Sequence, residues 1–97
     1  MKYVMIDGAT AVISVEGAFN LCRTAIVNTE LNSAYQQGCT KVAVDFFKTT
    51  SIDSSAIRDL TKTRRRVHPE NFMARNATNA VLAALKAAKL DEWLKHE

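Results

Sequence analysis

The chain has 97 residues, of which 47% are hydrophobic and 24% are charged. This composition is typical of a globular domain with a single core, and it excludes intrinsic disorder. The net charge of +3 at pH 7 is too small to imply a nucleic-acid partner by itself. We therefore expect one domain that spans residues 1–97, with no nucleic acid among its partners.

The cysteines and the N-terminal segment exclude several further classes of protein. Cys22 and Cys39 form no CxxC pair and have no histidine cluster beside them, so we expect reduced thiols and no metal site. The first residues turn polar too soon for a signal peptide, and no apolar run approaches the roughly 20 residues of a membrane span. We expect a cytoplasmic protein with no membrane insertion and no cofactor.

Two short apolar runs at the start predict a pair of strands. Residues 3–6 form the first run, and Asp7-Gly8 follows as a turn signal because both residues tolerate positive φ. Residues 11–16 alternate as a half-buried strand does, and Gly17 ends them. The side that we expect to be buried carries Ala11, Ile13 and Val15.

A helix follows, with Asn20 as its cap. It runs to about Gln37, and Gly38 lies just past its end, where a glycine is expected. Two stripes compete for its buried face. One contains Val27, Leu31 and Ala34, and the other contains Cys22, Ala25, Ile26 and Thr29.

Residues 42–46 predict a central strand, because they are apolar on both faces until Asp45. The next helix begins near Ser54 or Ser55 and reaches Val67, and Pro69 stops it. The residues of this helix that we expect to face the core are Ile57, Leu60 and Val67.

Residues 72–75 predict a fourth strand, and Thr78 then caps a third helix. Its apolar residues are Val81, Leu82, Leu85 and Ala88, and the tail carries Leu90, Trp93 and Leu94. The predicted order is ββαβαβα. Strands separated by helices imply an α/β fold with a mixed four-stranded sheet and helices mainly on one face.

The segment at 51–57, Ser-Ile-Asp-Ser-Ser-Ala-Ile, joins a strand to a helix. It places small hydroxyl groups at the positive end of a helix, on a surface loop. This position suits a phosphate-controlled switch or a partner contact better than it suits catalysis. Asp53-Ser54-Ser55 can also be a simple helix cap, since these residue types dominate such positions.

The chain resembles the STAS domain family, whose members include bacterial anti-anti-sigma factors and the cytosolic domain of sulfate transporters. The resemblance covers nearly the whole chain. It rests on Gly17 after the second strand, on the strand at 42–46, on the segment at 51–57, and on residues 78–81 leading to Leu85 and Leu90. The family pattern has glycine where Ala56 stands, and often has glycine at the position of Lys89.

The resemblance implies a regulatory protein-binding module, not an enzyme, and no catalytic residue. A STAS protein of this kind binds an anti-sigma factor with serine kinase activity, is phosphorylated by it and is released. A metal-dependent serine phosphatase then restores binding. Carried onto this chain, the phosphoacceptor is Ser54. The implied partner-binding residues around it are Asp53, Ser55, Ala56, Asn20, Ala18, Thr50 and Ser51.

Two other functions remain open. The chain can be a STAS-type accessory subunit that regulates a membrane transporter or a lipid-export ATPase by docking on its nucleotide-binding subunit. It can also be a weak nucleic-acid-binding module that uses Arg58, Lys62 and Arg65, which share one helix face. A solvated outer helix face, or a docking surface for an acidic partner, explains the same basic residues.

Overall fold

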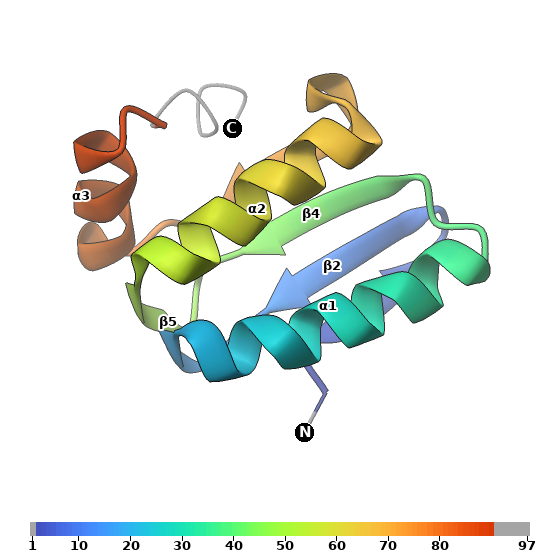
Figure 1. Ribbon diagram of the computed structural model, residues 1–97, viewed down its shortest axis with the longest axis horizontal. Coiled ribbons are helices and arrows are strands. Elements are labelled where there is room, and N and C mark those ends of the chain that lie inside the picture. Colours follow the sequence, from blue (N-terminus) through green and yellow to red (C-terminus); the bar gives the residue numbers. More distant parts are fainter. Residues whose placement is uncertain (1, 91–97) are drawn as a thin grey trace.

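The computed structural model describes residues 2–90 and is shown in Figure 1. Its elements are β1 (Val4–Asp7), β2 (Thr10–Ser14), β3 (Gly17–Phe19), α1 (Leu21–Gln36), β4 (Lys41–Asp45), β5 (Thr49–Ile52), α2 (Ser54–Val67), η1 (Pro69–Asn71), β6 (Phe72–Arg75) and α3 (Asn79–Ala87). The main sheet has the order β1-β2-β4-β6. β1 is antiparallel to β2, and the other pairs are parallel. The prediction of a mixed four-stranded sheet in an α/β fold is confirmed.

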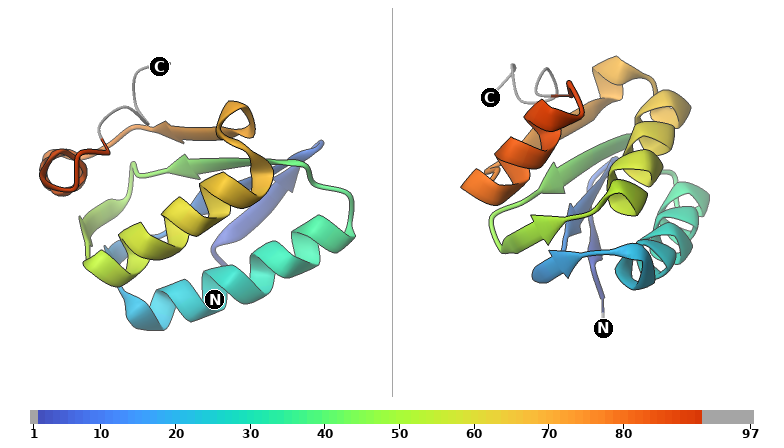
Figure 2. Two further views of the ribbon diagram at one scale, coloured as in Figure 1. Left: turned by 45° about the horizontal axis from the view of Figure 1, so that its top comes forward. Right: turned by 60° about the vertical axis from the view of Figure 1, so that its left-hand side comes forward.

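One face of the sheet is covered by α1 and α2 (Figure 2). Two rows of paired residues cross the four strands on this face. They are Val4, Ile13, Val44, Ala74 and Ile6, Ala11, Val42, Phe72. All of these side chains are buried except Ile6, near the turn of the first hairpin. The predicted buried side of β2 is therefore correct.

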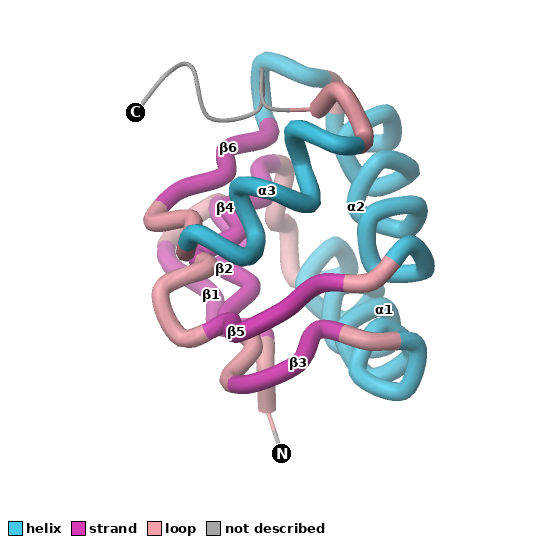
Figure 3. The backbone as a smooth tube through the Cα atoms, turned by 90° about the vertical axis from the view of Figure 1, so that its left-hand side faces the viewer, coloured by secondary structure: helices cyan, strands magenta, loops and turns pink. Residues whose placement is uncertain are grey.

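No described helix covers the opposite face of the sheet, as the side view in Figure 3 shows. The row that crosses this face consists of Met5, Val12, Ala43 and Met73. The helices lie on one side of the sheet, as predicted. On the helix-free face, Met5 and Met73 on the edge strands are exposed, whereas Ala43 on the central strand β4 is buried.

Helix α1 confirms the first of the two competing stripes. Its buried residues are Thr24, Val27, Leu31 and Ala34, whereas every member of the other stripe is exposed. A pair of hydrogen bonds explains this rotation of the helix. One carboxylate oxygen of Glu30 accepts from the backbone N–H groups of Tyr3 and Val4, at 2.7 and 2.8 Å. Glu30 thus fastens α1 to the start of β1.

Helix α2 begins at Ser54 and ends at Val67, as predicted. Its buried residues are Ala56, Leu60, Thr63 and Val67. Ile57, which we expected in the core, is only half-buried, because Ala56 and Thr63 complete the inward stripe at spacings of four and three residues. The hydroxyl of Thr63 donates to the carbonyl oxygen of Asp59 at 3.0 Å, so this buried polar group is satisfied.

Two strands were not predicted. β3 and β5 pair in parallel and form a separate two-stranded sheet. Gly17, which we expected to end a strand, begins β3 in a left-handed conformation (φ +86°). Three or four residues are too few to show a period of two, which is why the sequence pattern does not reveal these strands.

Helices α1 and α3 end in the same way, with a left-handed residue just past the helix. This residue is Gly38 after α1 (φ +99°) and Lys89 after α3 (φ +59°). In both cases its N–H bonds a carbonyl three residues back, and the next N–H bonds a carbonyl five residues back. Leu90 thereby packs partly against the core, whereas Trp93 and Leu94 lie outside the described residues.

Candidate docking site

Asp53 and Ser54 mark the start of helix α2. Asp53 caps the helix in an extended conformation (φ −101°, ψ 175°), and its Oδ1 accepts from the backbone N–H of Ala56 at 2.9 Å. Ser54 is the first helical residue, and it is exposed. Ser55 is half-buried. Asp53 is therefore the cap, and Ser54 and Ser55 lie within the first turn of the helix. This arrangement leaves the Ser54 side chain at the surface, where another protein can reach it.

The start of α1 lies beside the start of α2. In the β3–β5 pair, Ala18 is opposite Ser51, and the N–H of Asp53 donates to the carbonyl oxygen of Phe19 at 3.1 Å. Asn20, which follows Phe19, is therefore next to the cap of α2. Its Oδ1 accepts from the N–H of Arg23 at 3.2 Å and caps α1. Two capped helix starts thus share one end of the molecule (Figure 1).

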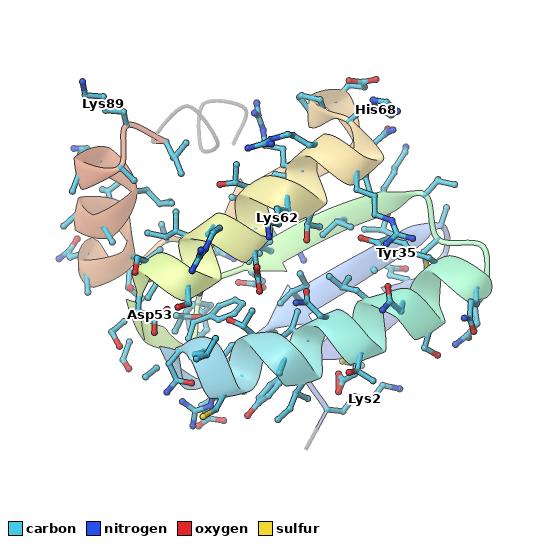
Figure 4. All side chains as sticks on the ribbon, viewed as in Figure 1. Lys2, Tyr35, Asp53, Lys62, His68 and Lys89 are labelled. Atoms are coloured by element: carbon cyan, nitrogen blue, oxygen red, sulfur yellow. The ribbon has the colours of Figure 1, made fainter. Side chains whose placement is uncertain are left out.

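The charges at this end come from the helix starts and from a few side chains. Both helix N-termini bring partial positive charge, and Figure 4 labels Asp53, the acidic cap of one of them. The Arg23 guanidinium donates to the carbonyl oxygen of Ala18 and to the hydroxyl of Tyr3, the latter at 3.2 Å. Arg58 is exposed one turn after Ser54. Ser54 therefore has a carboxylate directly before it in the chain and a cation one helical turn after it.

The neighbouring residues divide into exposed and buried ones. Thr50 and Ser51 are exposed on β5. Thr49, in the same run of hydroxyls, is fully buried, and its hydroxyl donates to the carbonyl oxygen of Val15 at 2.7 Å. Ala56 is also fully buried in the core. The structure therefore corrects one expectation, because the side chain of Ala56 packs inward and is not available to a partner.

The structure adds Phe47 to the candidate docking residues, which the sequence analysis did not include. Its side chain is 69% exposed in the turn between β4 and β5. It borders an open hollow of about 620 Å³ whose lining includes Glu16, Gly17, Lys48 and Thr50. The pair Phe46-Phe47 directly after β4 is the signal that could have found it, since Phe46 is fully buried and two adjacent aromatic side chains at the end of a strand seldom both fit into the core.

A family comparison decides the class of this fold. A protein-family model described as "Mlab, STAS domain" matches residues 4–95. The chain belongs to the STAS domain family. No curated protein sequence matches it.

Three solved structures similar to this STAS domain are described as anti-sigma factor antagonists, one of them as putative. SpoIIAA in its unphosphorylated form gives a TM-score of 0.79 at 19% identity, covering 93% of this chain and 81% of that one. A putative antagonist from Thermotoga maritima gives 0.79 at 15%, covering 95% and 81%. An antagonist from Mycobacterium paratuberculosis gives 0.73 at 16%, covering 95% and 80%. At these identities the likeness establishes the fold.

The STAS domain has a second hollow, between α1 and α2, of about 280 Å³. The guanidinium of Arg66 lies over the ring of Tyr35, 4.2 Å from its centre. Burial raises the pKa of the Tyr35 phenol, and the charge of Arg66 offsets part of that rise. The basic residues Arg58, Lys62 and Arg65 are exposed along α2. Figure 4 labels Lys62 along α2 and Asp53 at its start.

Three further observations concern metal ligands, thiols and helix length in the part of the STAS domain that the structure describes. Within residues 2–90, no group of three or more His, Cys, Asp or Glu side chains is arranged to hold a metal ion. Cys22 is exposed and Cys39 is buried, and neither forms a disulfide. None of the helices in this range has both the length and the apolar character needed to cross a bilayer.

Proposed function

We propose that this STAS domain is a regulatory protein-binding module, an anti-sigma factor antagonist whose docking is controlled by phosphorylation of Ser54. The observation that carries the proposal is the exposed position of Ser54 as the first residue of α2, directly after the Asp53 cap. The similarity in fold to several anti-sigma factor antagonists supports it. In this proposal the site binds and carries no catalytic group.

The docking surface in this proposal is the shared end of α1 and α2. Ser54 and Asp53 lie at its centre, with Ser55 beside them. Ala18 and Asn20 contribute from β3 and the start of α1, and Thr50 and Ser51 contribute from β5. The partner is an anti-sigma factor with serine kinase activity, and a metal-dependent serine phosphatase reverses the modification.

Phosphate at Ser54 changes docking more than folding. The group adds a charge of about −1.5 to −2. Backbone N–H groups in the first turn of α2 and the exposed Arg58 lie close enough in sequence to stabilise that charge in the free protein. A partner that fits closely over Ser54 and Asp53 would instead have to bury it beside a carboxylate, which is unfavourable. The fold therefore survives and the complex dissociates.

The direct test is to incubate the protein with its cognate switch kinase and ATP, and to map the phosphate by mass spectrometry. We expect phosphate on Ser54 and none on a Ser54→Ala variant. Ser54→Asp should weaken partner binding at least tenfold, which corresponds to about 1.4 kcal/mol. Its melting temperature should stay close to that of the wild type. Thr40→Asp is the matched control, since it adds the same charge at an exposed residue between α1 and β4.

Two outcomes would contradict this function. Phosphate found only outside residues 49–55 would remove the switch. Equal affinity of Ser54→Asp and wild type for the partner would remove the electrostatic mechanism. Either result would leave a module that binds constitutively.

The exposed Phe47 favours a second candidate, an accessory subunit that docks on the nucleotide-binding subunit of a membrane transporter or lipid-export ATPase. An aromatic side chain that is 69% exposed beside an open hollow offers an apolar contact that needs no phosphate. The two candidates differ in their response to charge at position 54. Phe47→Ser should weaken binding to such a subunit and Ser54→Asp should not, whereas the switch proposal requires Ser54→Asp to weaken binding.

A further inference from the structure

The hollow between α1 and α2 is a feature of this STAS domain that the Ser54 site does not use. It has a volume of about 280 Å³ and lies between the two helices that cover the sheet. Leu31 on α1 and Thr63 on α2 form its floor, and they are only 2% and 8% exposed. The hydroxyl of Thr63 already donates within its own helix. A molecule in this hollow would therefore be held by the side chains of the walls.

Two contacts between the helices close the hollow at its ends. At one end, Nδ2 of Asn28 donates to Oδ2 of Asp59 at 3.1 Å. At the other end, the guanidinium of Arg66 lies over the ring of Tyr35, 4.2 Å from its centre. The two contacts are seven residues apart on each helix, so the space between them is roughly 10 Å long. This length suits a small molecule, and the closed ends leave no room for a helix or strand of a partner to lie along the groove.

The walls between these two contacts carry polar groups that have no partner. Asn32 on α1 and Lys62 on α2 line the hollow, one turn past its first closure, and neither makes a hydrogen bond or an ion pair within residues 2–90. Figure 4 labels Lys62 on α2 and Tyr35 near the end of α1. The contact with Tyr35 uses the face of the Arg66 guanidinium, so its in-plane N–H groups can still donate. An ammonium, a guanidinium edge and an amide thus surround one small space.

The charges around the hollow favour an anion. Helix α2 carries five basic residues, and Asp59 is its single acid. The charged residues of α1 are Arg23 and Glu30, and both are bonded elsewhere, to the β3 strand and to the start of β1. Two cations, Lys62 and Arg66, therefore line the hollow against one carboxylate. One carboxylate is too few for a divalent cation, and the polar walls suit an apolar molecule poorly.

We propose that this hollow binds a small molecule through an oxyanion group, a carboxylate or a phosphate. Lys62 supplies the opposite charge in the middle of the hollow, Arg66 donates from one end, and the amide of Asn32 donates from α1. Asp59 stays at the far end, where the Asn28 amide holds it. The bound molecule bridges the two helices and stabilises the folded domain, because the unfolded chain has no such site.

A nuclear magnetic resonance titration of the isotope-labelled full chain tests the proposal. The probes are sodium acetate and inorganic phosphate, each compared with sodium chloride at the same ionic strength. We expect the side-chain amide signal of Asn32 and the backbone signals around Lys62 to move and to saturate. The dissociation constant of the better probe should be on the order of 1 mM or below. Saturation by acetate alone identifies a carboxylate site, and saturation by phosphate alone identifies a phosphate site.

Three substitutions on α2 separate this site from general attraction to a basic helix. Lys62→Gln should weaken binding of the better probe about tenfold, because it removes the central charge. Arg65→Gln is the matched control, since Arg65 is exposed on the same helix but does not line the hollow. Its affinity should stay within about twofold of the wild type. Asp59→Asn should strengthen binding, because it removes the only negative charge of the lining and keeps an oxygen for the Asn28 amide.

Three results would overturn the proposal. One is a shift that saturates with neither probe. Another is an equal loss of affinity in Lys62→Gln and Arg65→Gln, which would show only general attraction to the positive charge of α2. The third is weaker binding by an Asp59→Asn variant that keeps the native circular dichroism spectrum. The hollow shares no residue with the Ser54 site, so Ser54→Asp should leave probe binding unchanged, and failure of one proposal leaves the other standing.

Discussion

The two faces of the main sheet are built from alternate residues of the same strands, yet they differ in what surrounds them. On β2, Ile13 faces the helices and is fully buried, whereas its neighbour Val12 faces away and is half-buried. On β4, three apolar residues follow one another, so both faces look alike in sequence. Apolar character alone therefore does not show which face of a strand the helices cover. The helices that cover one face make the difference.

The largest expected effect comes from shortening a side chain on each of the two faces of β2. Ile13→Ala removes a fully buried side chain and leaves a cavity against the helices. It should lower the free energy of unfolding by about 2–5 kcal/mol. Val12→Ala removes a half-buried side chain and should cost less than about 1 kcal/mol. Urea unfolding at low protein concentration measures both. Equal losses would show that the second face is also sealed in the monomer.

The next effect comes from enlarging an alanine on each face. Ala74 on β6 is fully buried beneath the helices, so Ala74→Leu overpacks the core and should cost about 1–3 kcal/mol. Ala43 on β4 lies in the helix-free row. It is itself only 4% exposed, but no described helix lies over this face, so a leucine there can extend outward. Ala43→Leu should therefore change stability by less than about 0.5 kcal/mol. A destabilised Ala43→Leu monomer would contradict an open face.

The smallest effect lies on the outer side of the helix layer, at Tyr35. Burial raises the pKa of this phenol, and Arg66 only partly offsets it. The folded state therefore holds the proton more tightly than the unfolded state. The contribution of the protonated phenol to the free energy of unfolding is therefore complete below the pKa of about 10 in the unfolded state. It is lost as the pH rises through the raised pKa of the folded state.

Tyr35→Phe isolates this contribution. Urea unfolding of wild type and variant between about pH 9 and about pH 11.5 should show the wild type losing more stability as the pH rises. Arg66→Gln is a useful companion, because removal of the cation should raise the pKa of Tyr35 further. Parallel curves for wild type and Tyr35→Phe would show that burial of the phenol has no consequence for stability.

Much of the fold could be predicted from the sequence. Residues 72–75 form a strand with the predicted bounds, and the caps Asn20, Asp53 and Thr78 lie where their residue types indicate. These features are local, and each follows from its own side chains and neighbours. The parallel order of β2, β4 and β6 also follows from strands that alternate with helices.

The remaining features depend on contacts between distant residues. The rotation of α1 depends on Glu30 bonding the start of β1, 26 and 27 residues away. β3 and β5 exist because they pair with each other across the chain. The burial of Ala56 and the exposure of Phe47 likewise depend on what packs beside them. For the site, the resemblance pointed to Ser54, and the three-dimensional arrangement then put Phe47 on the same end of the molecule.

The hydrogen bond from Asp53 to Phe19 has a mechanical consequence. It ties the residue before Ser54 to the residue before Asn20, so the beginnings of the two long helices share one frame. A partner that binds at this point therefore contacts the starts of both helices together. A displacement of one helix start is therefore passed to the other through this hydrogen bond.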